Sequence, residues 1–358
     1  MKKNHDNFLN LAFNIAEINL GKTGLNPSVG CVVVKNNSVI SSGYTSLNGR
    51  PHAEFNALNT KKDFKNAVLY VTMEPCTHYG LTPPCTNLII KKGIKSVYYS
   101  FEDIDNRTAK RAKKKLGKKK IKVFKKGLIR FNNFYQSYFS VKKFNKPLID
   151  AKIAVSRDFF TIKKKTKQIT NYFSKQRTFL IRSRYDAIIS TSKTINEDNA
   201  VLNCRLNGFN NYKPDLIIVD RNLKIKKNLD IFNDLNNRKI YIATKITKNK
   251  KLKFFKKKGI KIINLSSFNT KQDFISFFQK LKKYSFNRIL VESGLIFLNE
   301  LIKYELISNL YLFQSSEKLG KKGSNNTSID QVKKLKLTKK IKVNLKNDKL
   351  YKVRLNNV

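Results

Sequence analysis

Apolar positions along the chain follow two patterns, short continuous runs and longer segments with a helical repeat. Residues 5–20 carry apolar side chains at helical spacing and predict an amphipathic first helix. Residues 67–73 are apolar and partly β-branched, which predicts a buried strand. Strands that alternate with helices are typical of layered α/β folds. The pattern therefore predicts a protein of the α/β class.

The same two patterns divide the chain into halves. In the first half they predict strands at 29–35, 39–43, 96–100 and 121–124, and helices at 51–58, 85–92, 107–116 and 132–141. In the second half they predict strands at 148–155, 187–190, 216–220, 239–244, 260–265, 288–294, 310–313, 341–345 and 350–354, and helices at 171–182, 272–283 and 295–304. The proline of Asn145-Lys146-Pro147 begins a new extended segment. We therefore expect two domains, residues 1–145 and 146–358.

Composition limits the class of protein. The chain has 358 residues and is 41% hydrophobic, enough for two packed cores. No apolar run approaches the roughly 20 residues that span a bilayer, so no membrane segment is expected. The first residues read as an amphipathic helix rather than a signal peptide. The four cysteines argue against a disulfide framework, which predicts a reducing, cytoplasmic location.

The formal net charge of +50 would ordinarily suggest a nucleic-acid partner. The lysines, however, are spread along nearly the whole chain together with Asn, Ile and Phe, as in proteins of AT-rich genomes. Lysine-rich stretches such as residues 113–120 and 248–258 are most simply solvated faces. We therefore expect no specific nucleic-acid binding, although the charge would attract phosphorylated substrates.

One set of residues carries chemistry that composition does not explain. His52, Cys76 and Cys85 supply an imidazole and two thiols, and Glu54 follows the histidine by two residues. Catalytic zinc takes three protein ligands and keeps one position for water. Zinc-dependent nucleobase deaminases use a His with two Cys, and a Glu that does not touch the metal moves protons. The pattern predicts a zinc site with Glu54 as the catalytic residue.

Local sequence would place these groups at the ends of elements. A helix at residues 51–58 would begin with Pro51 and carry His52 and Glu54 in its first turn. The strand at 67–73 would deliver Cys76 just past its end. The start of the helix at 85–92 would favour the thiolate of Cys85. The alternative is that the cysteines are small buried hydrophobes and the histidine a satisfied polar residue.

The spacing of the two cysteines distinguishes among the families of zinc-dependent deaminases. Residues 75–85 read Pro-Cys-Thr-His-Tyr-Gly-Leu-Thr-Pro-Pro-Cys, so the two cysteines are not separated by the common two residues. This string, with residues 26–34 and Gly43-Tyr44, resembles the deaminase half of the bifunctional riboflavin-biosynthesis deaminase/reductase family. The resemblance implies a cytidine-deaminase-like α/β/α first domain. It also implies that Asn26 hydrogen-bonds the substrate ring, and the alternative is that Asn26 caps a turn.

The second half is similar to the reductase domain of the same family, a dihydrofolate-reductase-like α/β fold that uses NADPH. The matching segments are residues 152–158, 169–170, 182–188, 194–198 and 291–294, with Leu202 and Arg205. The resemblance implies a cofactor site formed by Ala154, Thr194, Asp198 and Gly294. It implies a substrate site formed by Thr166, Arg182, Leu202, Arg205 and Glu292, in which the two arginines suit a phosphate.

The second half departs from the family pattern at four places. Phe159 stands where the family has Gly, and a phenylalanine does not readily take a positive φ. Gln168 replaces a Trp, Asn199 begins Asn-Ala in place of Asp-Pro, and Ser293 replaces Gly or Ala. All four changes lie in the half that resembles the reductase domain.

The resemblance implies two consecutive reactions in riboflavin biosynthesis. The first removes an amino group from 2,5-diamino-6-(5-phosphoribosylamino)pyrimidin-4-one, and the second reduces the ribose with NADPH to give 5-amino-6-(5-phosphoribitylamino)uracil. A rival is a deaminase of an RNA base or free nucleoside with a degenerate second domain. A non-enzymatic rival is a basic nucleic-acid-binding protein with a structural zinc, but such sites normally have four ligands. The sequence leaves open the role of His78 and whether the chain forms a homo-oligomer.

Overall fold

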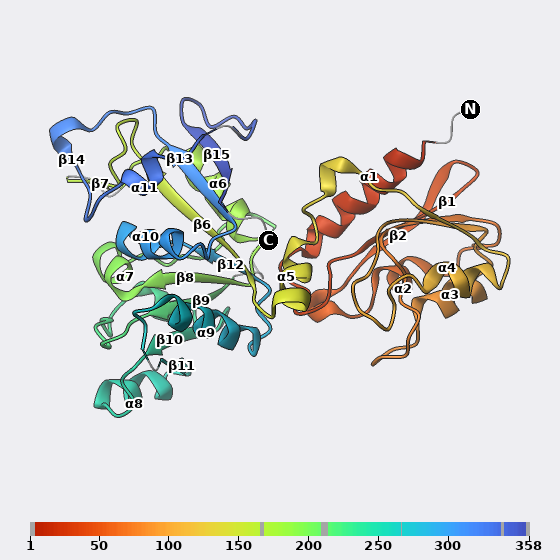
Figure 1. Ribbon diagram of the computed structural model, residues 1–358, viewed down its shortest axis with the longest axis horizontal. Helices are drawn as coiled ribbons and strands as arrows, with labels where there is room; N and C mark the ends of the chain where they lie inside the picture. The colour runs from red at the N-terminus through yellow and green to blue at the C-terminus, as the bar shows by residue number, and fades with distance from the viewer. Residues whose placement is uncertain (1–3, 165–167, 209–213, 266, 338–339, 356–358) are drawn as a thin grey trace. The chain divides into compact units, whose positions relative to one another are not determined.

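The computed structural model describes residues 4–164, 168–208, 214–265, 267–337 and 340–355. The chain divides into two compact units, Met1–Asn145 and Lys146–Val358. Each unit contains a sheet with helices beside it (Figure 1). Asn145 ends the last helix of the first unit with a left-handed φ of 56°, a conformation that asparagine tolerates better than most residues.

The first unit is built on a five-stranded sheet of order β2-β1-β3-β4-β5. β1 is antiparallel to β2 and β3, whereas β3, β4 and β5 run parallel. The strands are β1 (Gly30–Lys35), β2 (Ser38–Tyr44), β3 (Val68–Met73), β4 (Ser96–Phe101) and β5 (Lys122–Lys125). The α-helices are α1 (His5–Ala16), α2 (Ala53–Leu58), α3 (Cys85–Lys91), α4 (Ala112–Gly117) and α5 (Gln136–Phe144), with 3-10 turns η1 (Glu17–Asn19), η2 (Leu47–Gly49) and η3 (Ile129–Phe131).

Both faces of β1 are buried, and successive residues of this strand point to opposite sides of the sheet. Val32 and Val34 of β1 pack with Leu9 of α1. Cys31 and Val33, the alternate residues, pack in a second cluster with Ala57 of α2. The continuous apolar run of β1 is therefore explained by a helix on each side, and α2 is held against the sheet.

The second unit is built on an eight-stranded sheet of order β11-β10-β9-β8-β12-β6-β13-β15, parallel except for β15 at its edge. The strands are β6 (Leu148–Val155), β8 (Ala187–Thr191), β9 (Asp215–Val219), β10 (Ile240–Thr244), β11 (Lys261–Asn264), β12 (Arg288–Val291), β13 (Asn309–Gln314) and β15 (Lys349–Arg354), with a separate ribbon of β7 (Ile162–Lys163) and β14 (Gly323–Ser324). The α-helices are α6 (Tyr172–Arg182), α7 (Ser192–Asp198), α8 (Lys250–Lys257), α9 (Lys271–Lys282), α10 (Leu295–Lys303) and α11 (Asp330–Lys333), with 3-10 turns η4 (Asp230–Asp234) and η5 (Gly320–Lys322).

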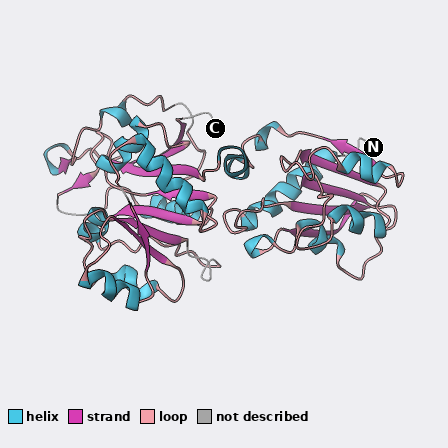
Figure 2. Cartoon of the chain, turned by 60° about the horizontal axis from the view of Figure 1, so that its bottom comes forward, coloured by secondary structure: helices cyan, strands magenta, loops and turns pink. Residues whose placement is uncertain are grey.

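Helices pack on both faces of this sheet (Figure 2). Ile217 of β9 lies in one cluster with Phe277 of α9, whereas its neighbour Ile218 lies in another with Phe255 of α8. Parallel strands buried in this way read as unbroken apolar runs. The strand predicted at 148–155 has the same bounds as β6, because the apolar run begins and ends where the strand does.

The structure corrects several expected elements. Residues 341–345 do not form the predicted strand, and the described residues there make only isolated bridges, Lys340 with Tyr351 and Leu345 with Asn347. Leu345 is nevertheless buried. The apolar residues of this segment therefore indicated burial of side chains and not a hydrogen-bonded strand. Helices α7 and α8 were not predicted. α8 lies in the lysine-rich stretch 248–258, where Leu252 and Phe255 form its buried side.

Helix starts also differ from the prediction. α2 begins at Ala53, with His52 as its N-cap, so Pro51 lies before the helix rather than at its first position. The helix predicted at 107–116 begins only at Ala112, and the one predicted at 132–141 begins at Gln136. Among the described helices, none combines the length and apolar character needed to cross a membrane.

Candidate active sites

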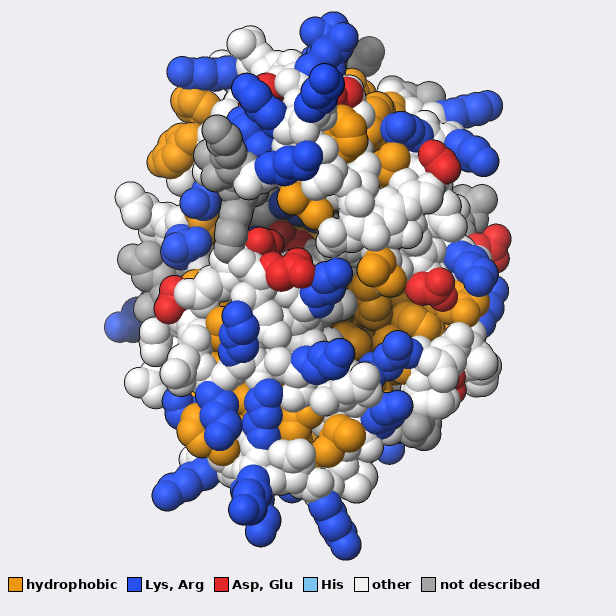
Figure 3. Space-filling model, turned by 90° about the vertical axis from the view of Figure 1, so that its left-hand side faces the viewer, with side chains coloured by type: hydrophobic (Ala, Val, Ile, Leu, Met, Phe, Trp, Pro, Cys, Tyr) orange, Lys and Arg blue, Asp and Glu red, His pale blue; other side chains and the backbone are white. Residues whose placement is uncertain are grey.

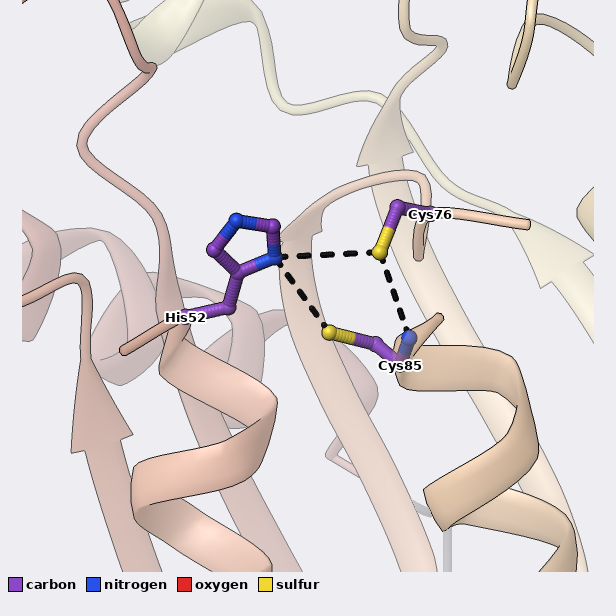
Figure 4. Close-up of side chains that lie close together, drawn as sticks. All are labelled: His52, Cys76 and Cys85. Carbon is purple, nitrogen blue, oxygen red and sulfur yellow. Dashed lines mark hydrogen bonds between the residues drawn. The ribbon is translucent and has the colours of Figure 1, made fainter. Parts of the chain in front are cut away.

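Three side chains of the metal-ligand type meet in the first unit. His52, Cys76 and Cys85 bring their ligand atoms within 4.8 Å of one another. His52 Nδ1 lies 3.7 Å from Cys76 Sγ and 3.4 Å from Cys85 Sγ (Figure 4). The imidazole turns Nδ1 toward both sulfurs and Nε2 away from them (Figure 4). These three atoms are therefore arranged around a common point.

The spacing of these atoms fits a zinc ion. Zinc bonds of about 2.0–2.1 Å to nitrogen and about 2.3 Å to sulfur, at tetrahedral angles, separate the two ligand atoms by about 3.5 Å. The nitrogen–sulfur distances of 3.7 and 3.4 Å agree with that value. One imidazole and two thiols are a donor set that zinc prefers, and three protein ligands are typical of catalytic sites.

The ends of three elements deliver these side chains. His52 caps α2, Cys85 is the first residue of α3, and Cys76 follows the end of β3. A side chain on Gly43 of β2 would place its Cβ 2.5 Å from the backbone of α2. Glycine at this position therefore allows the close approach of β2 that holds α2, and with it His52, in place.

The two thiols are not equivalent. The backbone N–H of Cys85 donates to Cys76 Sγ at 3.2 Å. Hydrogen bonds with Cys85 and His52 lower the pKa of Cys76 to about 4. The bond to Cys76 and burial raise the pKa of Cys85. The N–H group at the start of α3 therefore serves Cys76. The expectation that this helix start favours the thiolate of Cys85 stays a prediction.

Glu54 lies in the first turn of α2, beside the three-residue cluster. Its side chain is buried, with 4% of the residue exposed. Burial, and then the nearby Cys76, raise the pKa of Glu54 to about 7. A carboxyl group with a pKa near the working pH is suited to exchanging protons.

A cavity of about 110 Å³ adjoins this cluster, and His52, Glu54 and Cys76 are among its lining residues. Further polar residues of the lining were missed from the sequence: Arg50, Asp103, Asp105, Arg107, Tyr138 and Lys142. Asp103 and Asp105 follow β4 as Cys76 follows β3. Since parallel strands end at the same edge of a sheet, that position was the available signal.

Asn26 also lines this cavity, and its amide donates to the carbonyl of Gly49 at 3.2 Å. Gly49 has φ of 89°, and a Cβ there would lie 2.3 Å from the Asn26 amide nitrogen. Asn26 thus joins two loops and also lines the cavity. A structural role in the loop and a hydrogen bond to the substrate ring both agree with this position. His78 lines the cavity as well, with Nδ1 2.9 Å from Thr108 Oγ1.

A larger cavity of about 310 Å³ lies in the second unit, beyond the ends of β8, β9 and β12. Thr194 and Gly294 line it, and the N–H of Gly294 donates to Thr194 Oγ1 at 3.2 Å. Ala154 and Asp198 are not among the lining residues. Crevices at the carboxyl ends of parallel strands are the usual ligand sites of open α/β sheets. In Figure 3 the second unit faces the viewer, and its surface shows a hollow with acidic side chains among many Lys and Arg side chains.

Arg182 and Glu292 form a buried ion pair. Arg182 Nε and Nη2 donate to the two carboxylate oxygens at 2.5 and 2.9 Å, and Nη1 donates to the carbonyl of Asn203 at 2.9 Å. Lys152 Nζ lies 3.7 Å from Glu292. Burial would raise the pKa of Glu292, but Arg182 and Lys152 outweigh it and lower that pKa. Burial lowers the pKa of Lys152. Most Arg182 donors thus already have protein partners.

The other expected substrate residues differ in their surroundings. Arg205 is exposed and lies over the Phe179 ring at 5.3 Å. Leu202 is buried and has a positive φ of 52°. Thr166 lies outside the described residues. Of this group, Arg205 has the exposed guanidinium that an incoming phosphate requires.

Two departures from the family pattern have a backbone explanation. Phe159 adopts φ of 66°, so the expectation that phenylalanine does not readily take this conformation is wrong here. Its carbonyl accepts from the Asn325 side chain at 3.1 Å, which helps to hold the turn. Asn199 ends α7 in a left-handed conformation and exchanges hydrogen bonds of 2.9 and 3.0 Å with Asp230. Gln168 is exposed, and nothing in the structure explains that substitution.

Comparison with known proteins agrees with this arrangement. A family described as "Cytidine and deoxycytidylate deaminase zinc-binding region" matches residues 2–101, and one described as "RibD C-terminal domain" matches residues 147–354. Riboflavin biosynthesis protein RibD of Actinobacillus pleuropneumoniae is 30% identical over 92% of this chain and 90% of its own length. RibD of Aquifex aeolicus is 30% identical over 88% of this chain and 87% of its own.

Solved structures show the same fold. RibD of Acinetobacter baumannii superposes with a TM-score of 0.82 at 23% identity and covers 99% of both chains. A deaminase/reductase from Thermotoga maritima gives 0.82 at 24% identity, covering 98% of this chain and 99% of its own. The α/β class expected for both halves is confirmed, with a cytidine-deaminase-like first unit and a reductase-type second unit.

The fold and the matches define a two-part enzyme in which a zinc-type deaminase region precedes a reductase domain. The chain belongs to the family of the riboflavin biosynthesis protein RibD.

Proposed function

We propose that this chain catalyses two consecutive steps of riboflavin biosynthesis. The first unit, residues 1–145, removes an amino group from 2,5-diamino-6-(5-phosphoribosylamino)pyrimidin-4-one as ammonia. The second unit, residues 146–358, reduces the ribose of the product with NADPH to give 5-amino-6-(5-phosphoribitylamino)uracil. The observation that carries this proposal is the cluster of His52, Cys76 and Cys85 beside the buried Glu54, in a chain of the RibD family.

In the first unit, His52, Cys76 and Cys85 would hold a zinc ion, which supplies Lewis acidity that activates water near neutral pH. Glu54 acts as the catalytic residue. Its carboxyl group accepts a proton from the nucleophile and passes one to the departing amine, because its pKa of about 7 permits both steps. Asn26 orients the pyrimidine ring by a hydrogen bond from the cavity wall.

In the second unit, Thr194 and Gly294 would contact NADPH, which carries the hydride. Ala154 and Asp198 complete that site, although they are not among the residues that line the cavity. Arg205 offers an exposed guanidinium to the substrate phosphate. We assign Leu202 and Thr166 to the same substrate site on the family resemblance alone. Arg182 fixes Glu292, so that Glu292 presents an oriented carboxylate to the substrate.

The partners that follow are one zinc ion, NADPH and a phosphorylated pyrimidine. The proposal needs no nucleic acid and no membrane, and it places the protein in the cytoplasm, where free thiols persist. The described cysteines are free thiols, and two of them are the proposed zinc ligands Cys76 and Cys85.

The direct test is to incubate the purified protein with the diaminopyrimidine phosphate, with and without NADPH, and to identify the products by mass. Without NADPH we expect ammonia and the deaminated ribosyl compound, and with NADPH the ribityl compound. Ammonia release from cytidine or RNA, with no turnover of the diaminopyrimidine, would contradict the proposal. No observation in the structure favours that rival.

A further inference from the structure

The lining of the first unit's cavity contains three cations, Arg50, Arg107 and Lys142, together with carboxyl groups, and the cations differ in what they contact. Arg107 donates to both carboxylate oxygens of Asp105 at 2.9 and 2.7 Å. Lys142 Nζ lies 3.3 Å from the same carboxylate. Arg50, which precedes the Pro-His-Ala-Glu motif, forms no ion pair with a carboxylate among the residues that the structure describes. Arg50 is therefore the lining cation whose charge is not already neutralised.

The guanidinium of Arg50 lies next to the ring nitrogen of His52 that faces away from the thiols. Arg50 Nη1 is 3.4 Å from His52 Nε2. When Nδ1 of a neutral histidine is a metal ligand, the hydrogen is on Nε2, so Nε2 is a donor. Two donors that face each other cannot bond to one another. An anionic acceptor that lies beside both nitrogens could accept from each of them, and metal-bound histidines ordinarily give this hydrogen to an acceptor.

The insert between the two cysteines holds Arg50 in place and leaves room beside it. Arg50 Nη1 donates to Thr82 Oγ1 at 2.8 Å. A Cβ built on Gly80 would lie 3.6 Å from Arg50 Nη2 and 3.9 Å from His78 Nε2. A guanidinium and an imidazole thus flank the same point of the insert, where the chain has no side chain.

We propose that Arg50 is the specificity-determining residue that binds the phosphate of the deaminase substrate, between its guanidinium and His78. A guanidinium presents paired N–H groups that match two oxygens of a phosphomonoester. This inference rests on the proposed function, because it assumes a phosphorylated pyrimidine in this cavity. It assigns the selection of phosphorylated over unphosphorylated substrate to a residue outside the zinc and proton-transfer groups.

The kinetic test compares Arg50→Gln with Arg130→Gln, in which an exposed arginine of the same unit, outside the cavity lining, loses the same charge. We expect Arg50→Gln to raise KM for the phosphorylated substrate about 10–150-fold, the loss of a charge-assisted hydrogen bond, with a much smaller change in kcat. Arg130→Gln should match the wild type, and Arg50→Lys should recover part of the loss. Equal loss toward the substrate that lacks the phosphate would overturn the proposal.

A binding test needs no turnover. Calorimetric titration with ribose 5-phosphate is made on the full chain in an Arg205→Gln background, which removes the guanidinium proposed for the second unit. Adding Arg50→Gln should weaken the remaining site at least tenfold, at unchanged zinc content and thermal midpoint. Unchanged affinity overturns the proposal. If ribose 5-phosphate binds through Arg50 but the diaminopyrimidine is not deaminated, the proposed function fails, and only the phosphate site at Arg50 stands.

Discussion

At the scale of single residues, the state of Glu54 decides the chemistry of the first unit. The carboxyl group is almost fully buried and its pKa is raised to about 7 by burial. We expect Glu54→Gln to retain zinc, since the ligands are elsewhere, and to lower ammonia release by at least about 100-fold. Zinc content by elemental analysis and NADPH-dependent reduction of the deaminated substrate serve as controls. Wild-type ammonia release by a zinc-loaded Glu54→Gln protein contradicts the role assigned to this residue.

Asp158 connects the end of β6 to the turn η5. Its carboxylate accepts from Ser156 Oγ at 2.6 Å and from the N–H groups of Leu319 and Gly320 at 3.0 and 2.8 Å. Burial opposes ionisation, but these hydrogen bonds outweigh it and lower the pKa of Asp158 to about 2. The carboxylate therefore stabilises the fold fully above its ordinary pKa of about 4, and the contribution is lost as the pH falls through about 2.

We therefore expect Asp158→Asn to be less stable than the wild type at pH 7, and the difference to shrink below pH of about 4. Urea unfolding of both proteins across this range measures it. A difference that stays constant down to pH of about 2 would show that the charge of Asp158 does not contribute.

At the scale of elements, the packing of β2 against α2 holds His52 and Glu54 of the first site in place. A Cβ on Gly43 would lie 2.5 Å from Ala53 O and Ala57 N. We expect Gly43→Ala to destabilise the first unit by about 1–3 kcal/mol through overpacking, and to weaken zinc binding because α2 must shift. Gly117→Ala is the control, since a Cβ there has no neighbour within 4 Å. Equal zinc affinity and unfolding free energy in the two variants would contradict this view.

Strands that are buried on both faces could be predicted from the sequence, whereas helices whose first residue depends on an N-cap could not. The unbroken run of β6 gave its bounds, because burial of a parallel strand needs apolar residues throughout. Helix α7 was missed because it is short and polar, and its start depends on Thr191, whose side chain accepts from the N–H of Thr194. The start of α2 was misplaced because Pro51 fits the first position of a helix as well as the position before the cap.

The same distinction applies to the sites. His52, Cys76 and Cys85 lie within one short stretch of sequence, so their spacing predicted the cluster that the structure shows, with Glu54 beside it. The pairing of Arg182 with Glu292 spans 110 residues and depends on β12 lying beside β8 in the sheet. Sequence pattern does not carry that information. Resemblance to a family supplied the two residues but not their contact with each other.

At the scale of the whole molecule, the net charge of +50 has a measurable consequence. We expect the protein to bind RNA non-specifically at low salt, and we expect this binding to weaken steeply as salt increases, because it depends on released counterions. A salt titration of fluorescent RNA, followed by anisotropy, measures the slope. Tight binding that persists at about 150 mM salt, with a preference among sequences, would instead indicate a specific nucleic-acid partner.

The two units have separate cores, and a mutation in one should therefore leave the other intact. Glu292→Gln leaves the buried Arg182 and the partly buried Lys152 without a compensating charge, which costs about 3–5 kcal/mol. We expect this variant to lower the melting transition of the second unit while the first keeps its zinc and its transition. Glu305→Gln, which breaks an exposed pair with Lys271, should cost less than about 1 kcal/mol. Scanning calorimetry with zinc analysis distinguishes the outcomes, and a joint shift of both transitions would mean that the units unfold together.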